Sequence, residues 1–258
     1  MKLYSWNING FRSVCSKLEW DWFKHVGAAG GAAIVGLQET KAEKEQVPDE
    51  HRDPDGWHSY WLSGVRKGYS GVAVFSSLAP LAVTYELPQP AWRGEGRLIH
   101  LEYKDFHYMN VYFPNGQSGE ERLNYKLGFY DAFLDYAEEL RRQKPIVVCG
   151  DFNTAHRPID LARPKENEGT SGFLPVERAW LDKFTERGYV DTFRLVHGER
   201  ENQYSWWSFR MRARERNVGW RIDYFFVSAE LKDKVRDAWI EPEVRGSDHC
   251  PIGLELDL

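Results

Sequence analysis

The feature that most constrains the fold is a repeated pattern in which a short, β-branched, apolar run ends abruptly in a polar residue. Three examples are the runs 3–6, 33–37 and 146–149, which end at Asn7, at Gln38 and Glu39, and at Gly150 and Asp151. Such runs predict buried strands whose ends carry polar groups. We expect further strands at 60–62, 72–75, 81–85, 98–103, 107–112, 222–227 and 252–256. This number of strands requires more than one sheet.

Helices are expected between these strands. The clearest lies at about residues 119–142, where apolar residues recur at steps of three and four. Shorter helices are expected near Lys17, with Ser16 as the N-cap, and from Pro175. Because strands outnumber helices, we expect helices on one face of each sheet and a second sheet on the other. This pattern favours a layered α/β sandwich, and the sequence contains no glycine-rich nucleotide-binding string.

Length and composition limit the class of protein. The 258 residues allow one large or two small domains, but no repeat or linker divides them, so we expect a single domain over 1–258. A content of 42% hydrophobic and 28% charged residues excludes a disordered or fibrous chain. No apolar run approaches the roughly 18 residues of a membrane helix, and residues 1–7 lack the apolar core of a signal peptide. A cytoplasmic location is therefore expected.

Charge and cysteine content bear on partners. The formal net charge of -5 argues against general attraction to nucleic acid. However, the run from Arg210 to Arg221 holds five arginines against one glutamate and follows several aromatic residues, so one face could bind an anionic partner. Cys15, Cys149 and Cys250 form no C-x-x-C pair, and we interpret them as free thiols.

Several polar residues have both a functional and a structural interpretation. Asp223 lies in an apolar run, where an unpaired carboxylate would cost several kcal/mol to bury. It either forms a structural salt bridge or strand-end cap, or pairs with His249. A carboxylate partner would fix the His249 imidazole in one tautomer and keep it cationic. Asp151 and Asn153 follow a buried strand two residues apart, so they either face one substrate or stabilise a turn.

The candidate residues together favour one kind of chemistry. They offer carboxylate and amide oxygens and one imidazole: Asn7, Asn9, Glu39, Asp151, Asn153, Asp223, Asp248 and His249. Taken alone, Asn7 and Asn9 are also typical of a strand that runs into a turn. Hard oxygen ligands suit Mg²⁺ or Mn²⁺ with a phosphate, whereas zinc is disfavoured.

Nine strings, in order along nearly the whole chain, carry a family resemblance. They are W-N-I-N-G (6–10), L-Q-E-T-K (37–41), G-Y-S-G-V-A (68–73), Y-F-P-N-G (112–116), G-D-F-N-T-A-H (150–156), I-D-L-A-R-P-K (159–165), S-G-F-L-P-V-E-R (171–178), R-A-R-E-R-N-V-G-W-R-I-D-Y (212–224) and G-S-D-H-C-P (246–251). The sequence resembles the exonuclease III family of apurinic/apyrimidinic (AP) endonucleases. DNase I and the inositol polyphosphate phosphatases share the Glu and Asp-His elements, whereas N-V-G-W-R-I-D-Y is particular to the DNA repair branch.

The resemblance implies a fold and an activity. The fold would be DNase I-like, a four-layer α/β sandwich of two face-to-face mixed sheets flanked by helices. The activity would be Mg²⁺-dependent hydrolysis of the phosphodiester 5′ to abasic sites in duplex DNA, with Mn²⁺ as a substitute. We also expect 3′→5′ exonuclease and 3′-phosphodiesterase activity, and incision at uridine or damaged nucleotides is an open question. The protein would act as a monomer at the nucleoid, without a membrane partner.

The resemblance also implies residue roles. Glu39 would hold the metal, with Asn9 and Asp248 as further candidates. Asp151 would orient or deprotonate the attacking water, or manage the proton of the leaving group. The other catalytic residues would bind the phosphate (Asn153, His249, Tyr112), pair with His249 (Asp223) or hydrogen-bond near Asp151 (Asn7). Substrate contacts would come from Asn115, Arg210, Trp206, Trp220, Ile222, Lys41 and Arg12. The two tryptophans and Ile222 would form the pocket for a flipped sugar, and Arg210 would enter the duplex.

Two departures and two alternatives remain. Some family members have Asp at the position of Asn9, so an amide hydrogen bond or a water-mediated contact is expected there in place of a direct metal bond. Residues Gly116 to Gly119 offer no bulky side chain to insert into DNA.

One alternative is a phosphatase or phospholipid diesterase of the same superfamily. The other is a non-catalytic nucleic-acid-binding module, which is disfavoured because carboxylates facing a polyanion would only repel it.

Overall fold

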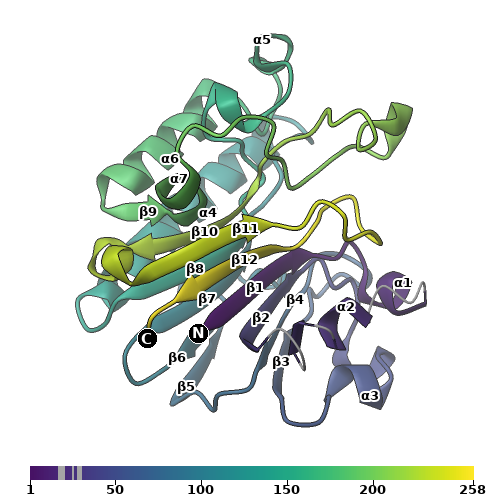
Figure 1. Ribbon diagram of the computed structural model, residues 1–258, viewed down its shortest axis with the longest axis vertical. Helices are drawn as coiled ribbons and strands as arrows, with labels where there is room; N and C mark the ends of the chain where they lie inside the picture. Colours follow the sequence, from purple (N-terminus) through teal and green to yellow (C-terminus); the bar gives the residue numbers. More distant parts are fainter. Residues whose placement is uncertain (17–20, 25, 28–30) are drawn as a thin grey trace.

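Two β-sheets face each other across the interior, and helices cover the outer side of each sheet (Figure 1). This arrangement is seen in a computed structural model that describes residues 1–16, 21–24, 26–27 and 31–258. It confirms the expected four-layer α/β sandwich with mixed sheets.

The first sheet contains the N-terminal strand. Its six described strands have the order β11-β12-β1-β2-β4-β3. Their bounds are Lys2–Asn7 (β1), Ala32–Gln38 (β2), His58–Leu62 (β3), Val72–Ser76 (β4), Val235–Ile240 (β11) and Ile252–Leu256 (β12). Strands β1 and β2 are parallel, so their carboxyl ends lie at the same edge of the sheet.

The second sheet repeats this design. Its six described strands have the order β5-β6-β7-β8-β10-β9. Their bounds are Ala82–Tyr85 (β5), Leu98–Glu102 (β6), His107–Tyr112 (β7), Ile146–Asp151 (β8), Tyr189–Asp191 (β9) and Asp223–Ser228 (β10). Here β7 and β8 are the parallel pair, and they end together at Tyr112 and Asp151.

Helices close the two outer faces. The α-helices are Phe11–Ser16 (α1), Asp21–Lys24 (α2), Asp49–Arg52 (α3), Glu120–Arg141 (α4), Pro164–Asn167 (α5), Pro175–Glu186 (α6) and Thr192–His197 (α7). Short 3₁₀ helices are Lys44–Gln46, Pro90–Trp92, Pro158–Asp160, Arg210–Arg212 and Ala229–Lys234. Helices α1 and α2 pack on the first sheet, and α4 and α6 pack on the second. Among the described helices, none combines the length and apolar character that crossing a bilayer requires.

Alternating side chains give the inner strands, such as β1 and β8, two buried faces. On β8, Ile146 and Val148 pack under α4 and α6, whereas Val147 and Cys149 point between the sheets. On β1, Leu3 joins the cluster between the sheets, while its neighbours face the helices. Burial on both faces explains why these runs are apolar throughout until they end.

Most predicted elements are confirmed, within two residues at their ends. Strands β9 and β11 were not predicted, because β9 has three residues and β11 is an edge strand with exposed charged residues. The N-cap prediction for Ser16 was wrong, since Ser16 ends α1 and its hydroxyl donates to the Ser13 carbonyl. The predicted helix start at Lys17 lies outside the described residues. The three cysteines are free thiols, as expected.

Candidate active site

Strand ends bring buried polar side chains to one end of the gap between the sheets. On β8, the alternation that points Cys149 between the sheets also points Asp151 there. On β1, Leu3 points between the sheets, and the same alternation points Asn7, four residues later, to that side as well. Asp223 of β10 lies opposite Asp151 in the antiparallel register. These three polar side chains are at most 3% exposed, so each requires a partner.

Glu39 directly follows β2 and is held as a carboxylate. Its Oε1 accepts a hydrogen bond from Asn7 Nδ2 at 3.0 Å, and its Oε2 lies 2.8 Å from Lys41 Nζ. Burial alone would raise the pKa of Glu39, but the charge of Lys41 and hydrogen bonds from Asn7, Lys41 and Tyr112 lower this pKa below its ordinary value. Glu39 is therefore a charged oxygen donor.

Asp151 is oriented by amide donors on both sides. Its Oδ2 accepts from Asn7 Nδ2 at 2.9 Å, and its Oδ1 accepts from the backbone N–H of Asn153 at 2.7 Å. Asn153 has a left-handed backbone with φ 52°, which turns its side chain back toward Asp151. Burial raises the pKa of Asp151 above its ordinary value and two nearby carboxylates add to this, although His249 opposes it.

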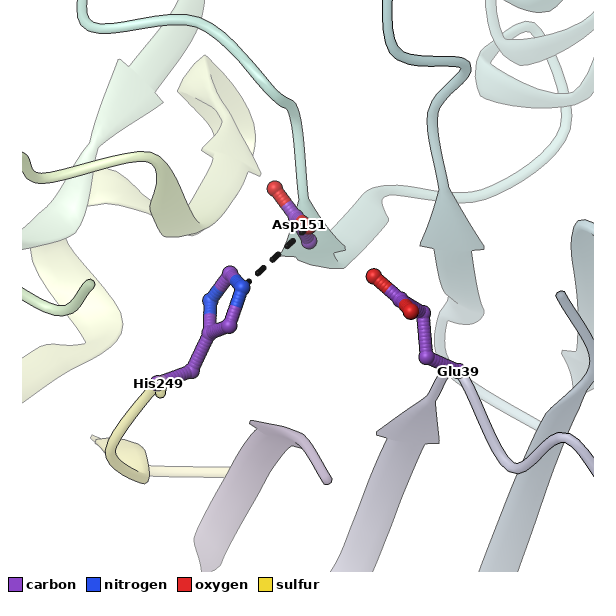
Figure 2. Close-up of side chains that lie close together, drawn as sticks. All are labelled: Glu39, Asp151 and His249. Carbon is purple, nitrogen blue, oxygen red and sulfur yellow. Dashed lines mark ion pairs between the residues drawn. The ribbon is translucent and has the colours of Figure 1, made fainter. Parts of the chain in front are cut away.

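His249 is bound to a second carboxylate. Its Nδ1 lies 2.8 Å from Asp223 Oδ2, which also accepts from the Ser205 hydroxyl at 2.6 Å. Its Nε2 lies 3.8 Å from Asp151 Oδ2 (Figure 2). Burial would lower the pKa of His249, but Asp223 and Asp151 raise it above its ordinary value. The imidazole is therefore a cation at neutral pH.

Glu39, Asp151 and His249 could together surround a metal ion. Each offers one ligand atom, and these atoms lie within 4.8 Å of one another (Figure 2). An imidazolium has no free lone pair, so the two carboxylates are the donors that remain. Two carboxylates beside an open cavity fit a hard cation that takes its other ligands from water or phosphate, such as Mg²⁺ or Mn²⁺.

The two further predicted metal ligands, Asn9 and Asp248, lie in a neighbouring hydrogen-bonded group. Asn9 Nδ2 donates to Asp248 Oδ1 at 2.8 Å, while Asn9 Oδ1 accepts from Lys41 Nζ. Asp248 Oδ2 accepts from the Trp206 indole at 3.0 Å. Asp248 is not part of the group formed by Glu39, Asp151 and His249, and Asn9 shares the Lys41 ammonium with Glu39.

Tyr112 ends β7 beside this group. Burial, followed by the charge of Glu39, raises the pKa of Tyr112 well above its ordinary value, so its hydroxyl remains a hydrogen-bond donor. The Arg97 guanidinium stacks 4.7 Å from the centre of the Tyr112 ring. Farther out, Asn115 Nδ2 donates to Asn153 Oδ1 at 3.0 Å.

A cavity of about 810 Å³ extends from the carboxylates to an aromatic wall. The wall contains Trp206, Trp220 and Ile222, and the two indoles meet edge to face at 6.2 Å. Asn115 and Arg210 also line the cavity, as expected of substrate contacts. Of the other predicted contacts, Lys41 is paired with Glu39, and Arg12 is exposed on α1 outside the lining residues.

The five-arginine run does not form one basic patch. Arg221 is buried and paired with Asp160 at 2.8 Å and with Asp191 at 2.7 Å. Arg214 donates to three backbone carbonyls and stacks on an indole ring. Part of the predicted basic patch is therefore unavailable to a partner, and the exposed members of the run are Arg210, Arg212 and Arg216.

Two serines that the sequence did not single out hold the site together. The Ser205 hydroxyl accepts the backbone N–H of Asp223 at 3.1 Å while donating to its carboxylate. The Ser247 hydroxyl donates to the Asn7 carbonyl at 2.7 Å and accepts the backbone N–H of His249 at 3.1 Å. No spacing marks Ser205, whereas Ser247 lies within the Ser-Asp-His string and could have been considered there.

Comparison with known proteins gives full-length similarities. The profile of the Endonuclease/Exonuclease/phosphatase family matches residues 4–249. The chain is similar to an exodeoxyribonuclease of Bacillus subtilis (strain 168), 46% identical over 258 residues and covering 100% of both chains. It is also similar to a DNA-(apurinic or apyrimidinic site) endonuclease of Dictyostelium discoideum, 39% identical over 261 residues that cover 100% of this chain and 71% of the relative. A 3′ phosphatase from Neisseria, solved with a product DNA hairpin, is similar in structure with a TM-score of 0.90 at 29% identity, covering 100% of both chains.

Proposed function

Because the chain belongs to the endonuclease/exonuclease/phosphatase family, we propose that its cavity binds an abasic site in duplex DNA and hydrolyses the phosphodiester 5′ to it. The protein is a DNA repair nuclease, as its full-length similarity to an exodeoxyribonuclease and an AP endonuclease supports. The observation that carries the finer proposal is that one cavity joins the carboxylates Glu39 and Asp151 to the aromatic wall of Trp206 and Trp220. A phosphate fits the first end and a base-free sugar fits the second.

Different side chains activate the attacking water and stabilise the charge that develops on the phosphate during hydrolysis. Asp151, oriented by Asn7 and Asn153, accepts the proton of the attacking water as the water oxygen bonds to phosphorus. The bond to the 3′ oxygen of the preceding nucleotide then breaks, and this oxygen takes a proton from solvent water to leave as a 3′ hydroxyl. His249, kept cationic by Asp223, and the Tyr112 hydroxyl donate hydrogen bonds to the phosphate oxygens as negative charge develops. A Mg²⁺ ion held by Glu39 and Asp151 would supply further charge neutralisation.

Activity at 3′ ends is a second candidate for the same site. It is supported by the similarity to a 3′ phosphatase whose structure holds a product DNA hairpin. We infer that the chain also removes nucleotides and 3′-blocking groups, as one monomeric catalytic domain acting on DNA at the nucleoid. A phospholipid substrate is disfavoured, because the exposed Arg210 and Arg216 line the same cavity as an aromatic wall suited to a sugar.

A comparison of substrates tests the proposed function. End-labelled duplexes carrying an abasic analogue, a uracil, a 3′-phosphate or no lesion are incubated with the protein, and the product ladders are compared. We expect a nick 5′ to the abasic analogue that requires added Mg²⁺ or Mn²⁺ and is not restored by zinc alone. Undiminished nicking in excess EDTA, or no nick at the abasic analogue, would contradict the proposal.

A further inference from the structure

A buried ion pair lies behind the cavity and takes no part in the chemistry above. It joins Lys126 of α4 to Glu177 of α6, with 2.6 Å between Nζ and Oε1. Both side chains are 0% exposed, and neither lines the cavity. A buried ion pair costs much desolvation energy, and apolar replacements are often as stable. The presence of this pair therefore requires an explanation beyond helix packing.

Lys126 holds the turn that carries Asn153. Besides Glu177, its Nζ donates to the Asn153 carbonyl at 2.8 Å and to the Thr154 hydroxyl at 2.8 Å. An ammonium group has three protons, so every donor of Lys126 is used. Two of the three hydrogen bonds hold the turn immediately after Asp151, one through the Asn153 backbone and one through the Thr154 side chain, and Asn153 adopts its left-handed conformation in this turn.

Glu177 holds the loop on the other side of the cavity. Its Oε1 accepts from the Ser171 hydroxyl at 2.9 Å, and its Oε2 accepts from the backbone N–H groups of Gly172 at 2.6 Å and Leu174 at 3.0 Å. Ser171 and Gly172 line the cavity. The carboxylate thus organises a cavity-lining loop in the same way that Lys126 organises the Asn153 turn.

The two segments meet with little free space. Gly172 has φ +98°, and a Cβ atom there would lie 3.1 Å from the Trp220 ring and 3.3 Å from the Asn153 carbonyl oxygen. The Gly172 carbonyl accepts from the backbone N–H of Ala155 at 2.8 Å. A small displacement of either segment would therefore change the distance between the phosphate end and the aromatic wall.

We propose that Lys126 and Glu177 are a positioning pair that fixes the Asn153 turn relative to the aromatic wall of the cavity. The pair touches no substrate and acts only through the two segments that it holds. This inference rests on the proposed function for its catalytic readout, since it assigns the pair to the geometry of the bound phosphate and sugar. A misplacement of about 1 Å in such a site can reduce turnover by about 10²-fold.

The test removes both charges at once, so that no unpaired charge remains buried. In Lys126→Met/Glu177→Gln, the glutamine has one acceptor oxygen in place of two, so it cannot accept all three hydrogen bonds from the loop, and the Asn153 carbonyl loses its ammonium donor. Well below the unfolding temperature, we expect kcat on abasic duplex to fall at least 10-fold, while KM stays within threefold. We also expect faster hydrogen exchange at the Gly172 and Leu174 amides. Glu177→Gln alone is a second variant, which destabilises the fold more because the buried Lys126 ammonium loses its carboxylate. It keeps the hydrogen bonds of Lys126 to the Asn153 turn, so we expect a smaller kcat loss of about three- to 10-fold.

A matched control is available in the same pair of helices. Lys183 of α6 and Asp131 of α4 form an ion pair at 2.8 Å that is exposed and away from the cavity. We expect Asp131→Asn/Lys183→Met to keep wild-type kcat, KM and amide exchange. A kcat within twofold of wild type in both folded Glu177 variants, or equal kcat losses in the control, would overturn the proposal.

The catalytic and exchange readouts separate the two proposals. Failure of the wild-type protein to nick abasic duplex would contradict the proposed function but leave the exchange measurement intact. Unchanged exchange at Gly172 and Leu174 in Lys126→Met/Glu177→Gln would overturn the positioning role, whatever the substrate.

Discussion

Asp151 lies among groups that change its proton affinity in opposite directions. Burial and the carboxylates of Asp223 and Glu39 favour its neutral form, whereas His249 and the Asn153 N–H favour its charged form. The net direction is an upward shift of the pKa, which suits a group that accepts a proton near neutral pH.

Substitution of Asp151 tests this role. Asp151→Asn should lower kcat on abasic duplex by about 10²-fold or more, because the amide cannot accept the proton of the water. Affinity for DNA should stay equal or increase, since a negative charge near the phosphate is lost. Single-turnover kinetics and equilibrium binding measure the two effects. The matched control is Glu166→Gln, an exposed carboxylate at the rim of the cavity, which should leave kcat unchanged. Near-normal turnover in Asp151→Asn would remove it from the mechanism.

The contact between Asp223 and His249 predicts non-additive losses. Asp223→Asn and His249→Gln should each reduce kcat, and the double variant should cost little more than the worse single one, because the 2.8 Å pair acts as a unit. A double-mutant cycle of kcat/KM measures the coupling, and Asp223→Asn combined with Glu166→Gln provides an additive reference. Additive losses in the Asp223 and His249 cycle would show that the two residues act separately.

At the scale of elements, neighbouring strands β6 and β7 carry a buried histidine pair. His100 Nε2 lies 2.9 Å from His107 Nδ1, and His100 Nδ1 lies 2.9 Å from the Tyr136 hydroxyl of α4. Burial, followed by the charge of His107, lowers the pKa of His100 to about 4. The fold therefore favours the neutral imidazole.

This shift predicts acid sensitivity of the second sheet. Unfolded His100 binds a proton below its ordinary pKa of about 6.5, whereas folded His100 binds one only below about pH 4. The contribution of this group to stability is therefore complete above pH 6.5. The free energy of unfolding falls by about 3 kcal/mol as the pH is lowered from 6.5 to 4. Urea unfolding at pH 7.5, 6 and 5 measures the loss. His100→Gln should show a smaller loss, whereas the exposed His58→Gln should behave as wild type. An equal pH dependence in His100→Gln would refute the assignment.

The 3₁₀ segment Arg210–Arg212 allows a test of lesion recognition. Arg210 lines the cavity, whereas the exposed Arg212, two residues on, does not. If Arg210 braces the gap left by an extruded nucleotide, Arg210→Ala should weaken binding to abasic duplex more than to undamaged duplex. Arg212→Ala should weaken both about equally and reduce the salt slope by about one, as for a phosphate contact. Binding curves across salt measure both, and parallel losses in Arg210→Ala would exclude the bracing role.

The sequence predicted strands well where a strand is buried and ends in a polar residue. The run that ends at Asp151 has both properties, because it is apolar along its length and is followed by a polar residue. It did not predict which arginines of the basic run are free, because Arg221 is neutralised by Asp160 and Asp191, which are 61 and 30 residues away. Pairing across such distances depends on the tertiary fold around the second sheet, and no local pattern encodes it. Ser205 was missed for the same reason.

At the scale of the whole molecule, the carboxylates of the site come from different sheets. Glu39 follows β2 of the first sheet, and Asp151 ends β8 of the second. A cation held by both would therefore bind the folded chain and not the unfolded one. Metal binding and folding are then thermodynamically linked.

Thermal unfolding with and without Mg²⁺ tests this linkage. At 100 times the Kd, Mg²⁺ should stabilise the wild-type protein by about 2.7 kcal/mol, which raises the Tm by about 5–10 °C in a chain of this size. Glu39→Gln should lose most of this increase, whereas Glu166→Gln should keep it. An equal increase in Glu39→Gln and wild type would mean that the cation binds elsewhere.

The hydrogen bond from Ser247 to the Asn7 carbonyl spans 240 residues of sequence. A ribosome adds about 5–20 residues per second, so β1 waits about 10–50 s before the segment that carries His249 is synthesised. During that interval the nascent chain has Glu39, and later Asp151, but not the imidazole that completes the group. A growing chain therefore cannot assemble the group of Glu39, Asp151 and His249 until residue 249 has been synthesised.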